Sequence, residues 1–293
     1  MTAAMPDAPD VRHRLLDLST AVTVHIAEAG PQDAPPVLAL HGWPQHWYAW
    51  RSVIPLLAGE RRVIAADLRG LGWSGWPDDG DFRKARMAED AVALLDALGI
   101  ERALLLGHDW GAWAGFLAAL QAPERWTGLV AASVPHPWQP RTRALRHAYR
   151  LAYQPLLAAP FISPRVMPQL AALALRSMAG DGPRPGGDEV FIAAYREPRR
   201  AEAASRLYRD FLLHEALPGV RGRLTVPTRL LYGTRDPLGT AFAEGLERHG
   251  DDARTILLEG AGHRVPEERP EAVASAVREL TPAPSRPPAP PPG

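Results

Sequence analysis

Short apolar runs mark the first half of the chain. Residues 37–40, 63–66 and 103–106 are continuous apolar runs, which are typical of strands buried in a parallel sheet. Residues 22–27 alternate between apolar and polar positions, as a half-buried strand does, and residues 129–132 form a further apolar run. The pattern therefore predicts five strands in this part of the chain.

Helical periodicity appears between these runs. Apolar residues at positions 87, 91, 94, 95 and 98 fall on one helical face, and Gly99 stands where that helix would end. A second helix is predicted for residues 110–121, soon after the third apolar run. Strands that alternate with helices in this way predict an α/β fold, a parallel sheet with helices on both faces.

The alternation stops after Ser133. Residues 137–218 are rich in arginine, show a helical pattern and contain no strand candidate. The strand pattern returns at residues 229–232 and 255–258, and a last helix is predicted for residues 268–280. The simplest organisation is one α/β core interrupted by a helical insertion.

This organisation predicts the domain boundaries. We expect residues 12–136 and 219–281 to form the core, and residues 137–218 to form a helical lid above it. Seven prolines stand between positions 282 and 292, so residues 282–293 are expected to be flexible, as are residues 1–11.

Composition narrows the classes of protein. The 293 residues include 33 basic and 33 acidic side chains, so a general nucleic-acid or polybasic membrane role has no electrostatic support. The chain has no cysteine, which excludes disulfides, thiolate metal sites and a cysteine nucleophile. No apolar run reaches the roughly 18 residues that a membrane span needs. The first ten residues lack the apolar stretch of a signal peptide, so we expect a cytoplasmic protein.

The strongest chemical signal is the Gly-His-Asp-Trp-Gly sequence at residues 107–111, between a predicted strand and a predicted helix. It has the form of a nucleophile elbow, G-x-S-x-G, with Asp109 in place of serine. The glycines allow the sharp turn that exposes the central side chain, and a carboxylate there can form an ester with a substrate. The competing interpretation is an ordinary helix N-cap.

Two further segments complete the order nucleophile, acid, histidine that such a triad follows along the chain. Asp236 stands in a Tyr-Gly-Thr-Arg-Asp-Pro sequence after a predicted strand, and His263 ends a Gly-Ala-Gly-His sequence after the last one. The alternative acid position, after the strand that ends near Ser133, holds no carboxylate. We therefore predict a triad of Asp109, Asp236 and His263.

A His-Gly-Trp-Pro sequence at residues 41–44 follows an early strand. In enzymes with a nucleophile elbow, a backbone N–H of this loop and the N–H of the residue after the nucleophile form the oxyanion hole. This predicts that the backbone amides of Trp43 and Trp110 are the donors of the oxyanion hole. The competing interpretation is a simple turn with a buried tryptophan. We expect four further residues to line the substrate pocket: His41, Gly42, Pro44 and His108.

Together these motifs resemble the α/β-hydrolase superfamily, specifically its epoxide hydrolase and haloalkane dehalogenase branch. The His-Gly-Trp-Pro loop resembles the epoxide hydrolase form, and the Asp-Leu-Arg-Gly-Leu-Gly-Trp-Ser sequence at residues 67–74 resembles the loop after the next strand. The resemblance covers residues 12–281. It implies an α/β-hydrolase fold with a mostly parallel sheet and a helical lid, a small-molecule substrate, and neither a metal nor an organic cofactor.

The resemblance also implies an activity. Epoxide hydrolases open an epoxide to a vicinal diol through a covalent aspartyl ester, and two lid tyrosines hydrogen-bond the epoxide oxygen. Tyr208 resembles the second of these, and Tyr153 lies about where the first belongs, with Tyr149 and Tyr195 as alternatives. Tyrosines at helical spacing also pack in cores, which is the competing interpretation.

Other activities stay open. A haloalkane dehalogenase could use the Trp110 indole for the halide, but that branch commonly has asparagine where this chain has Trp43. The fluoroacetate branch has arginine where this chain has Trp110. An ester or lactone hydrolase and a hydrolase-like binding protein without catalysis are further alternatives. The sequence leaves open the substrate, the stereochemistry and the oligomeric state, a homodimer included.

Overall fold

The computed structural model describes residues 4–216 and 219–280. The proline-rich tail predicted to be flexible, and the last two residues of the predicted lid, lie outside the described residues. Within the described residues, no helix is long and apolar enough to cross a membrane.

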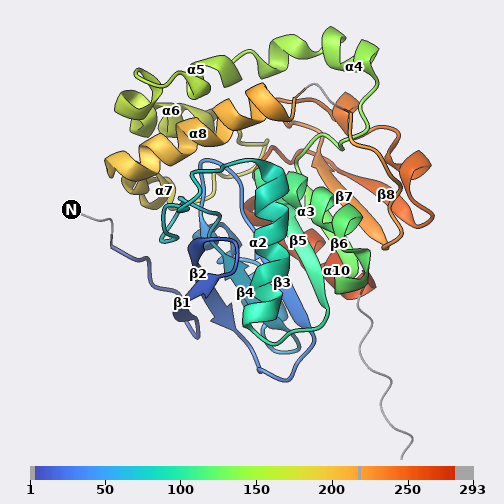
Figure 1. Cartoon of the computed structure of the whole chain (residues 1–293). Coiled ribbons are helices and arrows are strands. Elements are labelled where there is room, and N and C mark those ends of the chain that lie inside the picture. Colours follow the sequence, from blue (N-terminus) through green and yellow to red (C-terminus); the bar gives the residue numbers. More distant parts are fainter. Residues whose placement is uncertain (1–3, 217–218, 281–293) are drawn as a thin grey trace, which may run out of the picture.

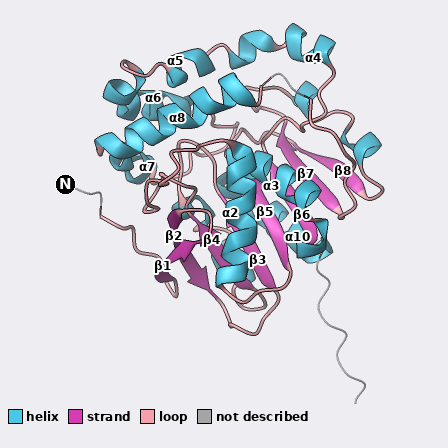
Figure 2. Cartoon of the chain, in the orientation of Figure 1, coloured by secondary structure: helices cyan, strands magenta, loops and turns pink. Residues whose placement is uncertain are grey.

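One eight-stranded sheet runs through the molecule, with helices on both of its faces (Figures 1 and 2). Its strands lie in the order β1-β2-β4-β3-β5-β6-β7-β8. The strands β1, β2 and β4 pair antiparallel, and every other pair is parallel. The strand bounds are β1 Arg12–Leu18, β2 Val22–Ala29, β3 Pro36–Leu40, β4 Arg62–Ala66, β5 Ala103–His108, β6 Trp126–Ala132, β7 Thr228–Gly233 and β8 Ala253–Leu258.

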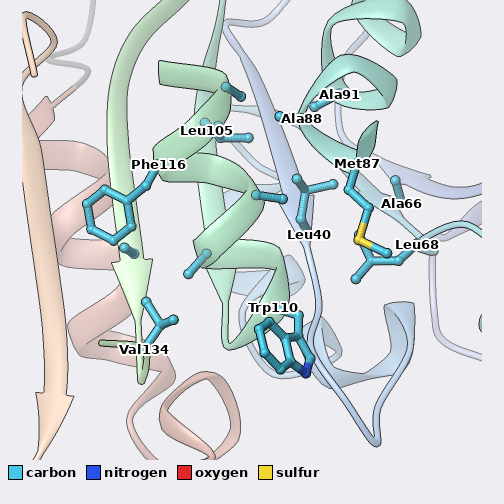
Figure 3. Packing of buried hydrophobic residues seen from close by; sticks show 14 of the residues in the cluster. Leu40, Ala66, Leu68, Met87, Ala88, Ala91, Leu105, Trp110, Phe116 and Val134 are labelled. Carbon is cyan, nitrogen blue, oxygen red and sulfur yellow. The ribbon is translucent and has the colours of Figure 1, made fainter. Parts of the chain in front are cut away.

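Two apolar cores follow from the alternation of side chains along the central strands. Leu40 and Leu105 belong to the core that also contains Met87 and Phe116, from the helices α2 and α3 (Figure 3). Their neighbours along the strands, such as Leu104, belong to a second core beneath α1 and α10. The flanking helices are α1 Ile54–Leu57, α2 Lys84–Ala97, α3 Trp110–Gln121, α9 Val265–Glu268 and α10 Pro270–Leu280.

A layer of helices stands between β6 and β7 in the sequence and above one end of the sheet (Figure 1). Its described residues, 137–216, contain no strand; we call them the helical layer. The helix bounds are α4 Arg141–Arg146, α5 Gln154–Ala158, α6 Ser163–Ser177, α7 Asp188–Ala194 and α8 Pro198–His214. The helix α8 packs against both α5 and α6.

Most predicted strands and helices are confirmed, and two of the differences have clear local causes. The strand β1 was not predicted because most of its residues are exposed, so it lacks the apolar pattern of a buried strand. The last predicted helix is split at Arg269, whose backbone is not helical, and Pro270 begins α10. A proline at that position begins a helix more readily than it continues one.

Candidate active site

Asp109 lies at a sharp turn between β5 and α3. Its backbone adopts φ +49° and ψ −120°, a conformation that non-glycine residues seldom adopt. The close packing of the turn depends on glycine: a Cβ on Gly107 would lie 2.5 Å from the Cα of Ala112, and one on Gly111 would lie 2.2 Å from the carbonyl oxygen of Leu40. The turn therefore projects the Asp109 side chain from the carboxyl end of β5.

The loop after β3 meets this turn. The backbone N–H of Trp43 donates to Oδ2 of Asp109 at 3.0 Å. A Cβ on Gly42 would lie 2.3 Å from the Cβ of Asp109, so only glycine allows this approach. Trp110, the other expected donor, is the first residue of α3, and amides in a helix's first turn have no acceptor within that helix. Both amides can therefore donate hydrogen bonds to negative charge that develops on the Asp109 carboxyl group.

His263 and Asp236 follow β8 and β7, two strands that end side by side at the same edge of the sheet. Nδ1 of His263 lies 2.8 Å from Oδ2 of Asp236. The other oxygen of Asp236 accepts the backbone N–H of Leu238, also at 2.8 Å. Nε2 of His263 lies 3.8 Å from Oδ1 of Asp109, beyond hydrogen-bond length. The three residues predicted as a triad are thus brought together in one place.

Charge controls the protonation of His263. Burial by itself lowers the pKa of this imidazole. The negative charges of Asp236 and Asp109, together with the hydrogen bond to Asp236, outweigh burial and raise the pKa of His263 to about 10. At neutral pH the ring therefore carries a proton, as an imidazolium between two carboxylates.

His41 and His108 lie beneath this site. Nε2 of His41 accepts the backbone N–H of Leu68 at 3.0 Å, and Nδ1 lies 3.0 Å from the carbonyl oxygen of Gly42. Nε2 of His108 lies 2.8 Å from the carbonyl oxygen of His263. Burial lowers the pKa of both rings, that of His108 to about 4. Both neutral histidines therefore connect loops of the site through hydrogen bonds to the backbone.

A cavity of about 210 Å³ lies between the sheet and the helical layer, next to His263. Trp43 and Tyr153 also border it. The rest of its lining is mainly apolar: Leu156, Leu157, Leu170, Leu173, Ala174, Met178, Pro237 and Leu238, with Arg150 and Ser177. The four residues expected to line the pocket, His41, Gly42, Pro44 and His108, do not border this cavity. The side chains of His41 and His108 are buried and form hydrogen bonds with the backbone.

Two of the four candidate tyrosines meet above Asp109. The ring of Tyr208, on α8, packs edge-on against Trp43 and Trp110, with centroid distances of 5.5 and 5.3 Å. The ring of Tyr153 lies 6.2 Å from that of Tyr208 and borders the cavity. Burial and the negative charge of Asp109 raise the pKa of both phenols, which keeps them protonated as donors.

The two alternative tyrosines lie elsewhere. Tyr149 is 67% exposed, and its ring packs against the guanidinium of Arg150. Tyr195 is buried at the end of α7, within the apolar core. Neither ring packs against Trp43 or Trp110 within the described residues, whereas Tyr208 packs against both and Tyr153 lies beside Tyr208. Tyr153 and Tyr208 are therefore the candidate tyrosines that lie beside the loops around Asp109.

Sequence reasoning missed the residues that attach the helical layer to the site. The backbone N–H of His263 donates to the carbonyl oxygen of Met178 at 2.8 Å. Lys84, the only lysine of the chain, is fully buried, lies 4.3 Å from the Trp110 ring centroid and donates to the carbonyl oxygen of Leu207 on α8. Burial lowers the pKa of Lys84 to about 7. The sequence shows that the chain has one lysine, but not that this lysine lies against the ring of Trp110.

Comparisons with known proteins agree with this architecture. A family model described as the alpha/beta hydrolase fold matches residues 35–270. The AB hydrolase superfamily protein YfhM of Bacillus subtilis is 30% identical, over 89% of this chain and 95% of that protein. Epoxide hydrolase A of Mycobacterium tuberculosis is 31% identical, over 91% and 96%. The structure of epoxide hydrolase A from Mycobacterium thermoresistibile matches with a TM-score of 0.75 at 27% identity, over 92% and 98%.

The chain therefore belongs to the alpha/beta hydrolase fold family. Its resemblance to the epoxide hydrolases is confirmed, since proteins of that name are among its relatives in both sequence and structure. The fold class predicted from the sequence is confirmed as well.

The close approach of Gly42 to Asp109 generates a prediction. Gly42→Ala should displace the Asp109 carboxylate, because the added methyl group would overlap its side chain. We expect turnover to fall by about 10²-fold or more, as small displacements of reacting groups do, while the protein stays folded. Gly182→Ala is the matched control, since a Cβ there meets nothing within 4 Å. Equal activity of both variants in a steady-state assay, with circular dichroism as the folding check, would contradict the assigned position of Asp109.

Proposed function

We propose that this protein is an epoxide hydrolase that opens an epoxide to a vicinal diol through an ester on Asp109. The observation that carries the proposal is a carboxylate at the elbow, with an amide donor on one oxygen and the His263–Asp236 pair 3.8 Å from the other. Attack of a carboxylate on an ester would give an anhydride, whereas attack on a strained sp³ carbon gives an ester that water can cleave. The chemistry of the nucleophile therefore favours an epoxide over an ester substrate.

In the first step, an oxygen of Asp109 attacks one epoxide carbon and the ring C–O bond breaks. The ring oxygen receives a proton from the phenol of Tyr153 or Tyr208, which is left as a phenolate while the other phenol donates a hydrogen bond to the ring oxygen. The product of this step is a hydroxyalkyl ester of Asp109. We further propose that residues 137–218 act as the lid that carries these tyrosines and shapes the cavity.

In the second step, His263 takes a proton from water, which attacks the carbonyl carbon of the Asp109 ester. The backbone amides of Trp43 and Trp110 hold the oxyanion, and Asp236 orients the imidazole and stabilises its charged form. Collapse of this intermediate releases the diol and restores the carboxylate.

Esterification changes the charge around His263 between the two steps. The ester of Asp109 is neutral, so one of the two carboxylates that raise the pKa of His263 disappears. The pKa of His263 therefore falls from about 10, and the ring releases its proton, which by way of solvent returns the phenolate formed in the first step to a phenol. The first step thus produces the neutral base that the second step needs.

A dehalogenase is the second candidate. The buried indole N–H groups of Trp43 and Trp110 have no hydrogen-bond partner within the described residues. Both rings pack against Tyr208 above Asp109, where a halide leaving a carbon under attack could accept hydrogen bonds from them. Assays with matched epoxide and bromoalkane substrates separate the two candidates.

The assignment of ester formation to Asp109 and of ester hydrolysis to His263 can be tested with His263→Gln. This variant should still form the ester, because Asp109 attacks without a base, but should not hydrolyse it. Mass spectrometry of the variant with a reactive epoxide should show an adduct of the substrate's full mass on the peptide that contains Asp109. Asp109→Asn in the same background is the control and should show none. If the wild-type protein is active but the His263→Gln variant forms no adduct, this assignment of the two steps is refuted.

The two phenols can be tested in the same background, where only ester formation is observed. Replacing both Tyr153 and Tyr208 with phenylalanine should slow adduct formation by on the order of 10²-fold or more, and either single change should cost less. Tyr149→Phe is the matched control and should leave the rate unchanged, because that ring is exposed. An undiminished rate in the double variant would remove both tyrosines from the mechanism.

The charge of His263 predicts different pH dependences for the two steps. Ester formation should be independent of pH from about 6 to 9, because it uses no base. Ester hydrolysis should accelerate with rising pH, by up to about tenfold per unit, until the lowered pKa of His263 in the ester is passed. Stopped-flow tryptophan fluorescence can follow both steps, since Trp43 and Trp110 flank Asp109. A pH-independent hydrolysis step would contradict the role of His263.

A further inference from the structure

The net charge of this chain is unevenly distributed along the sequence. Basic and acidic residues balance over the whole sequence, but residues 126–180 contain no aspartate or glutamate. They contain six arginines: Arg141, Arg143, Arg146, Arg150, Arg165 and Arg176. Arg143 pairs with Glu244, whereas four of the others, Arg141, Arg146, Arg165 and Arg176, form no ion pair within the described residues. The overall balance therefore conceals a segment with a net positive charge, because its arginines are not offset by acidic residues.

Exposed apolar side chains gather in the same segment. Twelve large hydrophobic residues are exposed among those that the structure describes, and eight of them lie between residues 145 and 173. These eight are Leu145, Tyr149, Tyr153, Leu156, Phe161, Ile162, Val166 and Leu173. Leu145 and Phe161 are each 77% exposed. Such a concentration of exposed apolar residues marks an interaction site rather than ordinary surface.

The placement of these residues forms an outer surface. The helices α4 and α5 lie on the outer edge of the helical layer, on the side away from the sheet (Figure 1). On α6, the exposed residues Arg165, Val166 and Leu173 share one side of the helix, and the buried residues Met167 and Ala171 share the other. We call the exposed residues of 141–176 the outer surface of the helical layer.

The catalytic cavity reaches this outer surface. Tyr153, Leu156 and Leu173 line the cavity and are also exposed to solvent. Arg150 lines it as well, and its guanidinium donates to the carbonyl oxygen of Pro237. A molecule bound to the outer surface would therefore lie next to the entrance of the candidate active site.

We propose that the outer surface of the helical layer docks on an anionic lipid bilayer, from which apolar substrates enter the cavity. Exposed leucine, phenylalanine and isoleucine side chains can insert at the boundary of headgroups and acyl chains, and arginines can contact lipid phosphates. A second copy of this chain fits the surface poorly, because a twofold contact would place unpaired arginines opposite arginines. Only the entry of substrate rests on the proposed function; the docking does not.

Vesicle binding tests this proposal directly. The full-length protein should co-sediment with vesicles of equal parts phosphatidylcholine and phosphatidylglycerol at least tenfold more strongly than with phosphatidylcholine alone. Raising the salt from about 0.05 to 0.5 M should weaken the binding, since the arginines act through charge. Equal binding to both vesicles, or no binding to either, would overturn the proposal.

Matched variants locate the binding surface. The pair Leu145→Asp and Phe161→Asp should reduce binding at least tenfold. The control pair Leu15→Asp and Leu257→Asp alters leucines that are 62% and 55% exposed on β1 and β8, and should bind as the wild type does. Binding by the first pair at the wild-type level, or an equal loss in the control pair, would overturn the proposal. So would self-association without vesicles, measured by sedimentation velocity, that only the first pair abolishes.

The same variants separate this proposal from the proposed function. Leu145 and Phe161 do not border the cavity, so their double variant should keep the wild-type rate on a small, water-soluble epoxide. Loss of vesicle binding with unchanged turnover supports docking at this surface. Absence of turnover in the wild type would refute the epoxide hydrolase proposal and leave the vesicle result standing.

Discussion

The backbone conformation of Asp109 is the constraint on which the site depends. A positive φ at a non-glycine residue costs roughly 1–3 kcal/mol and persists only where the surroundings enforce it. Here Gly42, Gly107 and Gly111 enforce it, because each lies so close to a neighbouring segment that a Cβ would overlap it. The sheet also positions the site, because its central strands end at one edge and bring the loops that follow them together. Close packing of backbone thus fixes the carboxylate where the amide of Trp43 can reach it.

In the proposed mechanism, electrostatics assigns different roles to Asp109, Asp236 and His263. His263 lies between two carboxylates, which raise its pKa to about 10 although burial opposes this. One of them, Asp236, keeps its hydrogen bond to the imidazole in every step that we propose, whereas Asp109 loses its charge when it becomes an ester. In the proposed mechanism, formation of the ester on Asp109 therefore controls the protonation of His263.

The sequence predicted the features that depend on residues close to one another along the chain. The elbow at Asp109 and the order of Asp236 and His263 could be predicted because glycine residues mark the turns and apolar runs mark where the strands end. The role of His41 was not, because its hydrogen bond to Leu68 joins loops 27 residues apart and follows from how two strands pair. The basic outer surface was hidden for a similar reason. Total charge was balanced, and only exposure in the fold shows that arginines and apolar side chains share one face.

The central claim is that Asp109 forms a covalent ester with the substrate, and oxygen labelling in a single turnover tests it most directly. With enzyme in excess over epoxide in ¹⁸O water, the first diol should contain only ¹⁶O, because its new oxygen comes from the Asp109 carboxylate. The label should appear instead in the peptide that contains Asp109, and should reach the diol only in later turnovers. Label in the diol during the first turnover, with none in the enzyme, would mean that water attacks the epoxide directly and would contradict the account.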